Sequence, residues 1–133
     1  MIIKSKKILS EISAGELLDK ISILEIKLDK IKDNENLEEI NKEYKILKDV
    51  QNSSIEVTEK LKNLFKEIKE VNLNLWNIED ELRICEKNKD FGKSFIKLAR
   101  EVYLNNDKRS KIKSEINKIL GSNIKEIKQY VDY

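Results

Sequence analysis

The sequence predicts an all-α fold: an elongated antiparallel bundle of about five helices with coiled-coil-like hairpins, in a single domain over residues 1–133. The chain has 0 prolines and 3 glycines among 133 residues, so few positions interrupt a helix. Leu, Ile, Lys and Glu dominate the composition, as in long helices. Apolar residues recur at intervals of three and four along most of the chain, which is the spacing of one helix face.

The first predicted helix, residues 14–32, has the clearest start signal. Ser13 precedes it and Glu16 follows three residues later, so the two side chains form a capping box for two backbone amides. Residues 33–36 then interrupt the pattern, and a second helix follows at 36–50. Both helices carry the alternating three- and four-residue spacing of a helix that packs along a near-parallel neighbour. These apolar positions are Leu17, Ile21, Leu24, Leu28 and Ile31, then Leu37, Ile40, Tyr44 and Leu47.

The third predicted helix, residues 54–87, is the longest. Ser53 and Glu56 form a second capping box, and the apolar spacing then continues without interruption as far as Cys85. At 1.5 Å per residue, this helix would span on the order of 50 Å. It is therefore expected to be the spine of the molecule.

The remaining elements are predicted from turn residues. Residues 105–107, Asn-Asn-Asp, predict a break between helices at 91–105 and 108–120. Gly121 predicts a left-handed stop, after which Ser122 caps a short C-terminal helix at 123–131. Residues 1–12 lack helical spacing and are expected to form an extended arm.

The charge balance argues against several classes of partner. The 27 basic residues face 25 acidic ones, so no field of one sign attracts nucleic acid or membrane, and we expect no specific nucleic acid. Residues 1–9 contain three lysines and are too short an apolar run for a signal peptide or a membrane span. The single cysteine, Cys85, falls on an apolar position and is predicted to be a buried thiol in a reducing, cytoplasmic compartment.

The composition also excludes familiar catalytic and metal sites. With 0 histidines, the chain has no His general base, no His-containing triad and no His-containing zinc site. The three isolated glycines do not form a phosphate-binding loop. Glu79, Asp80 and Glu86 leave carboxylate-only magnesium binding open. We nevertheless predict no metal site and no cofactor.

Arginine is used sparingly, since only 3 of the 27 basic residues are arginine: Arg83, Arg100 and Arg109. A guanidinium grips a carboxylate or phosphate with two hydrogen bonds, which lysine cannot reproduce. These positions are therefore candidates for ligand binding. The alternative is that they form structural ion pairs with residues such as Glu79, Glu86 or Asp107.

Three polar stripes flank the apolar positions and predict a candidate polar pocket. Side chains that lie beside an apolar stripe are partly buried, and charges there need partners. The stripes either converge on a pocket or form interhelical salt bridges that fix the register. The candidate residues are Lys20, Glu25, Lys27, Trp76, Glu79, Asp80, Arg83, Glu86, Arg100, Tyr103, Asp107 and Arg109.

One local basic cluster follows the predicted break, at residues 108–113. It contains Lys108, Arg109, Lys111 and Lys113, with no aromatic residue between them for base stacking. We interpret this cluster as a solvated helix face.

Two blocks of the sequence, GELLDKISILEIK at 15–27 and LWNIEDELRICEKNKDFG from residue 75, resemble a family of short, uncharacterised bacterial all-helical proteins. The second block continues to residue 117, so the resemblance covers most of the chain. It implies no reaction, because the family has no assigned function. The polar positions that it marks are Glu16, Asp19, Lys20, Glu25, Lys27, Trp76, Glu79, Asp80, Arg83, Glu86, Arg100, Tyr103, Asn106, Asp107 and Arg109.

A fainter likeness is to the helical chorismate mutases, whose first helix is similar to residues 18–21, Leu-Asp-Lys-Ile. That resemblance implies a cofactor-free enzyme that clamps a dianion between cationic side chains. The chain lacks the arginines expected in that family's first and second helices. Lys20, Lys27 and Arg83 would have to replace them.

Two functions are consistent with these patterns. The first is a helical module that self-associates or binds a partner protein, because a compact monomer hardly buries such long apolar stripes. The alternative is a bundle that binds an anionic metabolite, or a cofactor-free enzyme, with a Lys/Arg/Glu pocket. We expect a homo-oligomer or a protein partner in the first case and an anionic small molecule in the second.

Overall fold

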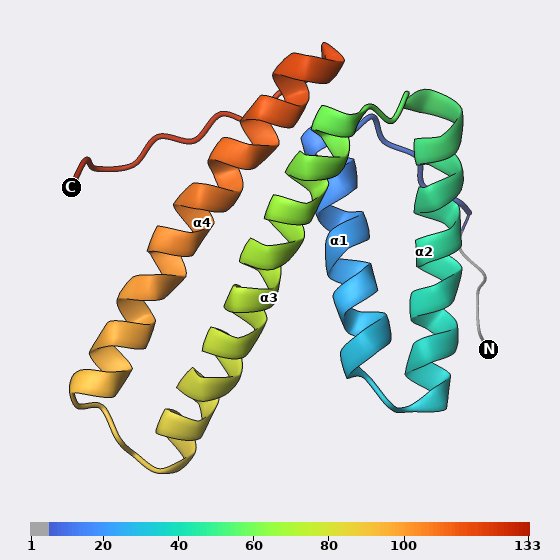
Figure 1. Cartoon of the computed structure of the whole chain (residues 1–133). Helices are drawn as coiled ribbons and strands as arrows, with labels where there is room; N and C mark the ends of the chain where they lie inside the picture. The colour runs from blue at the N-terminus through green and yellow to red at the C-terminus, as the bar shows by residue number, and fades with distance from the viewer. Residues whose placement is uncertain (1–5) are drawn as a thin grey trace.

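The computed structural model describes residues 6–133, which form four helices and no strand, so the predicted all-α class is confirmed. The elements are α1 (Ala14–Lys30), α2 (Asn34–Ser54), α3 (Glu59–Lys87) and α4 (Lys93–Leu120). Figure 1 shows two helical hairpins, α1–α2 and α3–α4, whose connecting turns lie apart. The prediction of about five helices is wrong by one, because α4 is continuous.

Helix α1 lies at the centre of the fold and packs against each of the other three helices. It is therefore buried around most of its circumference, whereas the spacing predicted one apolar face. The main core cluster joins α1 to α3 and α4 through Leu17, Leu18, Ile21, Leu61, Leu64 and Ile116. Side chains of α2, among them Tyr44 and Leu47, cover this cluster from one side.

Two helix starts show which capping signals were decisive. Ser13 caps α1 as predicted, since its hydroxyl accepts the backbone N–H of Glu16 at 3.1 Å. The predicted start of the third helix at Ser53 and Ser54 is wrong, because both residues belong to the last turn of α2. Thr58 caps α3 instead, and its hydroxyl accepts the N–H of Leu61 at 3.2 Å.

The predicted break at residues 105–107 is also wrong, since α4 runs through it. Asn105 donates a side-chain hydrogen bond of 2.8 Å to the carbonyl of Glu101, one turn earlier in the same helix. Asn and Asp are weak helix formers, but the cost of each is a fraction of a kcal/mol. Packing of α4 against α3 and α1 outweighs this cost.

The segments outside the helices differ from prediction at the C-terminus. Gly121 adopts the predicted left-handed conformation, with φ of 59°. No helix follows, so the predicted helix at 123–131 is wrong; Ile127 and Val131 are 86% and 91% exposed. A short helix is marginal without an apolar surface to pack on. Of the predicted N-terminal arm, residues 6–12 are exposed and irregular, and residues 1–5 lie outside the described residues.

Candidate functional site

A buried polar network joins α1, α3 and α4, and its centre is Asp19. The Asp19 carboxylate is 1% exposed and accepts two hydrogen bonds from Arg109, from Nε at 2.9 Å and from Nη2 at 2.5 Å. Asn72 donates to the same carboxylate and to the hydroxyl of Ser22, both at 2.8 Å. A buried carboxylate held by a two-pronged guanidinium and an amide is fully satisfied, so the network fixes how the three helices meet.

Lys113 extends this network toward the C-terminal segment. Its ammonium lies 2.7 Å from the Glu16 carboxylate, 3.1 Å from that of Glu126 and 3.8 Å from that of Asp19. Glu16 therefore directs its carboxylate to α4, although the sequence predicted that it would cap its own helix. Through Glu126, the segment after α4 is held against that helix.

The network raises the pKa values of its two cations. For Arg109, the hydrogen bond with Asp19 has the largest effect and raises the pKa. For Lys113, burial would lower the pKa, but hydrogen bonds to Glu16 and Glu126 outweigh it and the pKa is raised. The bond with Lys113 in turn lowers the pKa of Glu126. All of these groups are therefore charged at neutral pH.

Close packing of α1 on α4 depends on Gly15. A Cβ atom at this position would lie 2.6 Å from the backbone carbonyl oxygen of Lys113, closer than atoms can approach. The N–H of Gly15 donates to the Asn117 side chain at 2.7 Å, and the N–H of Ala14 donates to the Ser122 hydroxyl at 3.1 Å. The first amides of α1, which have no partner within the helix, are thus satisfied by α4 and the residues after it.

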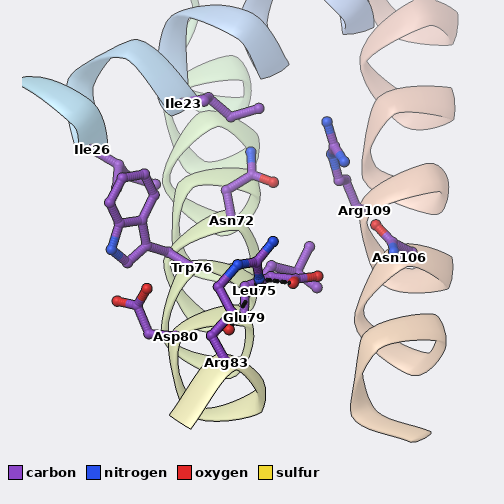
Figure 2. A pocket seen from close by; sticks show the side chains of 10 residues that line it. All are labelled: Ile23, Ile26, Asn72, Leu75, Trp76, Glu79, Asp80, Arg83, Asn106 and Arg109. Atoms are coloured by element: carbon purple, nitrogen blue, oxygen red, sulfur yellow. Dashed lines mark hydrogen bonds and ion pairs between the residues drawn. The ribbon is translucent and has the colours of Figure 1, made fainter. Parts of the chain in front are cut away.

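An open groove of about 410 Å³ lies beside this network, between α1, α3 and α4. Figure 2 shows Trp76 and Asp80 on one side of it and Arg109 and Asn106 on the other. Trp76 is the only tryptophan of the chain and is half-buried. The groove is lined by Ile23, Ile26, Asn72, Leu75, Trp76, Glu79, Asp80, Arg83, Asn106 and Arg109.

Five of the twelve residues predicted to form a polar pocket line this groove: Trp76, Glu79, Asp80, Arg83 and Arg109. The other seven lie elsewhere. Glu25 accepts hydrogen bonds from Lys69 and Tyr44, at 2.9 and 3.0 Å. Burial, together with the hydrogen bond to Glu25, raises the pKa of Tyr44. Lys20 and Glu86 form surface ion pairs with Glu16 and Lys89.

The last four predicted residues, Lys27, Arg100, Tyr103 and Asp107, also lie outside the groove. Lys27 is half-buried and Arg100 is exposed. Tyr103 packs edge-to-face on Tyr133, whose hydroxyl donates to Asp107. Tyr103 and Asp107 therefore hold the C-terminal residue against α4.

Two expectations of burial on α3 are wrong. Arg83 pairs with Glu79 at 2.5 Å, but its side chain is 73% exposed and that of Glu79 is 46% exposed. Cys85 is half-buried, not fully buried. Both residues lie beyond the end of the core, where no third helix covers α3.

The central residues Asp19, Ser22, Asn72 and Lys113 were absent from the predicted pocket, although the family resemblance marked Asp19. Lys113 is 8% exposed, so the solvated face predicted for its cluster is wrong at this position. A signal was present in α1, where Gly15, Asp19 and Ser22 repeat at helical spacing on a second face. Their burial depends on a third helix, which a single apolar stripe does not reveal.

The metal site and the chorismate mutase-like site considered from the sequence are not assembled in the described part of the chain. Residues 6–133 contain no cluster of three or more Cys, Asp or Glu residues able to hold a metal ion, so Glu79, Asp80 and Glu86 do not converge. Of the three cations in the chorismate mutase comparison, only Arg83 lines the groove. Within the same residues, every helix is too short or too polar to cross a membrane.

A second exposed feature is the far part of the α3–α4 hairpin, residues 79–106, which we call the distal hairpin. No residue of this segment is buried, although its apolar spacing continues from the core. Ile84, Phe91 and Ile96 are 57%, 51% and 55% exposed. The rings of Phe91 and Phe95 pack edge-to-face at the turn.

Comparison with known proteins identifies the family and no activity. No curated protein and no solved structure matches the chain significantly. A family of unknown function, DUF6165, matches residues 8–132, which is nearly the whole chain and agrees with the resemblance seen in its two blocks. The chain therefore belongs to the DUF6165 family.

Proposed function

We propose that the protein is a cytoplasmic helical module that self-associates through the distal hairpin. One observation carries this proposal: apolar residues continue beyond Ile78 on α3 and before Lys113 on α4, yet none of them is buried. The stripe itself is half-buried there. Ile84, Phe91 and Ile96 are more than half exposed, and a group of large exposed apolar side chains is typical of an interaction surface.

A second copy of the chain suits this surface better than an unrelated protein. Two helical hairpins that pack together form a four-helix bundle, in which each apolar stripe is covered. A two-fold dimer uses the same surface on both copies, so it needs only the residues present here.

The charges of the distal hairpin favour a particular pairing of helices. On α3, residues 79–87 carry four acidic and two basic side chains, a net charge of −2. On α4, residues 93–106 carry three basic and one acidic side chain, a net charge of +2. If α3 of each copy faces α4 of the other, opposite charges flank the apolar contact. Exposed ion pairs add little affinity, but like charges in the opposite pairing would be repulsive, so the charges select the orientation.

Sedimentation equilibrium from low to high micromolar concentration tests the proposal. We expect a monomer–dimer equilibrium that Ile84→Glu and Ile96→Glu each weaken by about tenfold or more, because a buried unpaired charge is costly. Ile46→Glu is the matched control, since Ile46 on α2 is also 55% exposed but lies outside the distal hairpin. A wild-type chain that stays monomeric at high micromolar concentration would contradict self-association, as would equal effects of all three variants.

A further inference from the structure

The geometry points to a ligand site that does not include the exposed apolar side chains Ile84, Phe91 and Ile96: the groove between α1, α3 and α4 binds a small molecule with a flat ring and a single carboxylate. The groove is open to solvent, yet its wall includes side chains of the buried network. Arg109 and Asn106 supply polar contacts, and Trp76 supplies the apolar one.

Arg109 is already oriented to receive an anion. Asp19 holds its Nε and Nη2 atoms, and no residue among 6–133 accepts a hydrogen bond from its Nη1 atom. The side chain is 29% exposed and lines the groove. A guanidinium fixed by a buried carboxylate loses little conformational freedom when a ligand binds its remaining nitrogen.

Asn106 provides a second donor for the same carboxylate. It lies three residues before Arg109 on α4, so the two side chains share one helix face, and Figure 2 shows both on the α4 side of the groove. A carboxylate has two oxygens and can accept one hydrogen bond from each residue. This pair defines the polar end of the site.

The opposite side of the groove suits a flat ring. Figure 2 shows the indole of Trp76 beside Ile26, across the groove from Arg109, and Ile23 and Leu75 complete the apolar lining. An aromatic ring gains from burial against these side chains and from stacking or edge contacts with the indole. The ligand's ring and carboxylate would therefore bind on opposite sides.

The charges of the groove limit the ligand to a single negative charge. Its lining contains two arginines, Arg83 and Arg109, and two carboxylates, Glu79 and Asp80. The charge of Asp19 lies directly behind Arg109. Together these groups sum to one net negative charge, so a polyphosphate or a dianion would meet more repulsion than a monoanion does.

The single tryptophan allows a direct test, because the indole N–H of Trp76 gives one resonance in a ¹H–¹⁵N NMR spectrum. Benzoate is the probe, and we expect a saturable shift with a dissociation constant of about a millimolar or lower. Benzamide, which has the ring without the charge, acetate, which has the charge without the ring, and pyrophosphate should each bind at least about tenfold more weakly. Using the Ile96→Glu chain separates this result from self-association.

Substitutions in the groove test whether benzoate binds there. Asn106→Ala and Trp76→Leu should each weaken benzoate binding by about tenfold, the latter followed by ligand-detected NMR, and neither touches the Asp19–Arg109 pair. Arg109→Lys should weaken it further, since the free Nη1 donor is lost. Arg100→Gln is the control and should bind as the unaltered chain does, because Arg100 lies outside the groove. Absence of a saturable shift, equal binding of benzamide, or unchanged affinity in both Asn106→Ala and Trp76→Leu would overturn the proposal.

Discussion

The two halves of the α3–α4 hairpin share one sequence pattern but have different environments. Near α1, Leu61, Ile68 and Ile116 are between 0% and 1% exposed. In the distal hairpin, Leu82 and Leu98 continue the pattern but are only half-buried. Ile84 and Ile96, which lie off the pattern, are 57% and 55% exposed. Apolar spacing therefore shows which face of a helix packs against a neighbour, whereas a third helix decides how completely that face is buried.

The same contrast holds for the ion pairs. Arg109–Asp19 and Arg83–Glu79 both have a nitrogen–oxygen distance of 2.5 Å, but the carboxylate of Asp19 is 1% exposed and that of Glu79 is 46% exposed. A buried carboxylate that loses its partner is costly, whereas an exposed pair contributes about 0–1 kcal/mol. Two ion pairs of equal length thus contribute differently to the free energy of unfolding.

The largest expected effect comes from the charge at the centre of the network. Asp19→Asn should lower the free energy of unfolding by about 3–5 kcal/mol, because it removes the negative partner of the half-buried Arg109 and of Lys113. Glu79→Gln is the matched change in the exposed pair and should cost less than about 1 kcal/mol. Urea unfolding followed by circular dichroism measures both. Similar losses in the two variants would break the distinction between the halves.

Core packing should give the next largest difference. Ile68→Ala should cost about 2–5 kcal/mol, since it leaves a cavity at a fully buried position. Ile84→Ala, on the same helix, should cost less than about 1 kcal/mol at a protein concentration low enough to keep the chain monomeric. A large loss for Ile84→Ala in the monomer would show that the distal hairpin is packed after all.

Gly15 and Gly92 differ in how closely backbone atoms of another helix approach them. Gly15→Ala should destabilise the chain by about 1–3 kcal/mol, because the new methyl group meets a backbone carbonyl of α4 that cannot move freely. Gly92→Ala, at the start of α4, places its methyl group 3.3 Å from the Asp90 side chain and should cost less. Thermal unfolding monitored by calorimetry compares the two. An unchanged melting temperature for Gly15→Ala would mean that α1 and α4 can separate without cost.

Arg83 should have little influence on stability. A buried structural ion pair at this position would have a large one. Arg83→Lys and Arg83→Met should both unfold within about 1 kcal/mol of the unaltered chain, since the pair with Glu79 is exposed. Urea melts of the two variants provide the measurement. If only the Met variant were strongly destabilised, a buried partner for Arg83 would be required.

The smallest expected effect concerns pH. The pKa of Glu126 is held below its ordinary value of 4.5 by Lys113, so its contribution to stability is present above that value and is lost as pH falls through the folded-state pKa. Glu126→Gln should therefore reduce slightly the loss of stability between pH 5 and pH 3. Glu115→Gln, at an exposed position on α4, is the control. Identical acid dependence in both variants would contradict a stabilising Lys113–Glu126 contact.

Local signals predicted the helices well where neighbours in sequence supply the contacts. The Ser13 cap and the Gly121 stop are set by residues within one turn, and both are confirmed. The predicted break at Asn105–Asp107 failed because small helix propensities were outweighed by contacts with distant helices. The capping box at Ser53 failed because α2 continued through it and Thr58 offered another cap.

The sequence by itself determined that the chain is all-helical and which helix faces are apolar, because both follow from the spacing of residues a few positions apart. The tertiary structure decided that α1 lies at the centre, that Asp19 is buried against Arg109, and that five predicted polar residues share one groove. These features depend on contacts between residues far apart in the sequence, such as Asp19 and Arg109, which are 90 positions apart. The same central helix ends before the distal hairpin begins, which is why identical spacing gives a buried core in one half of the α3–α4 hairpin and a half-buried stripe in the other.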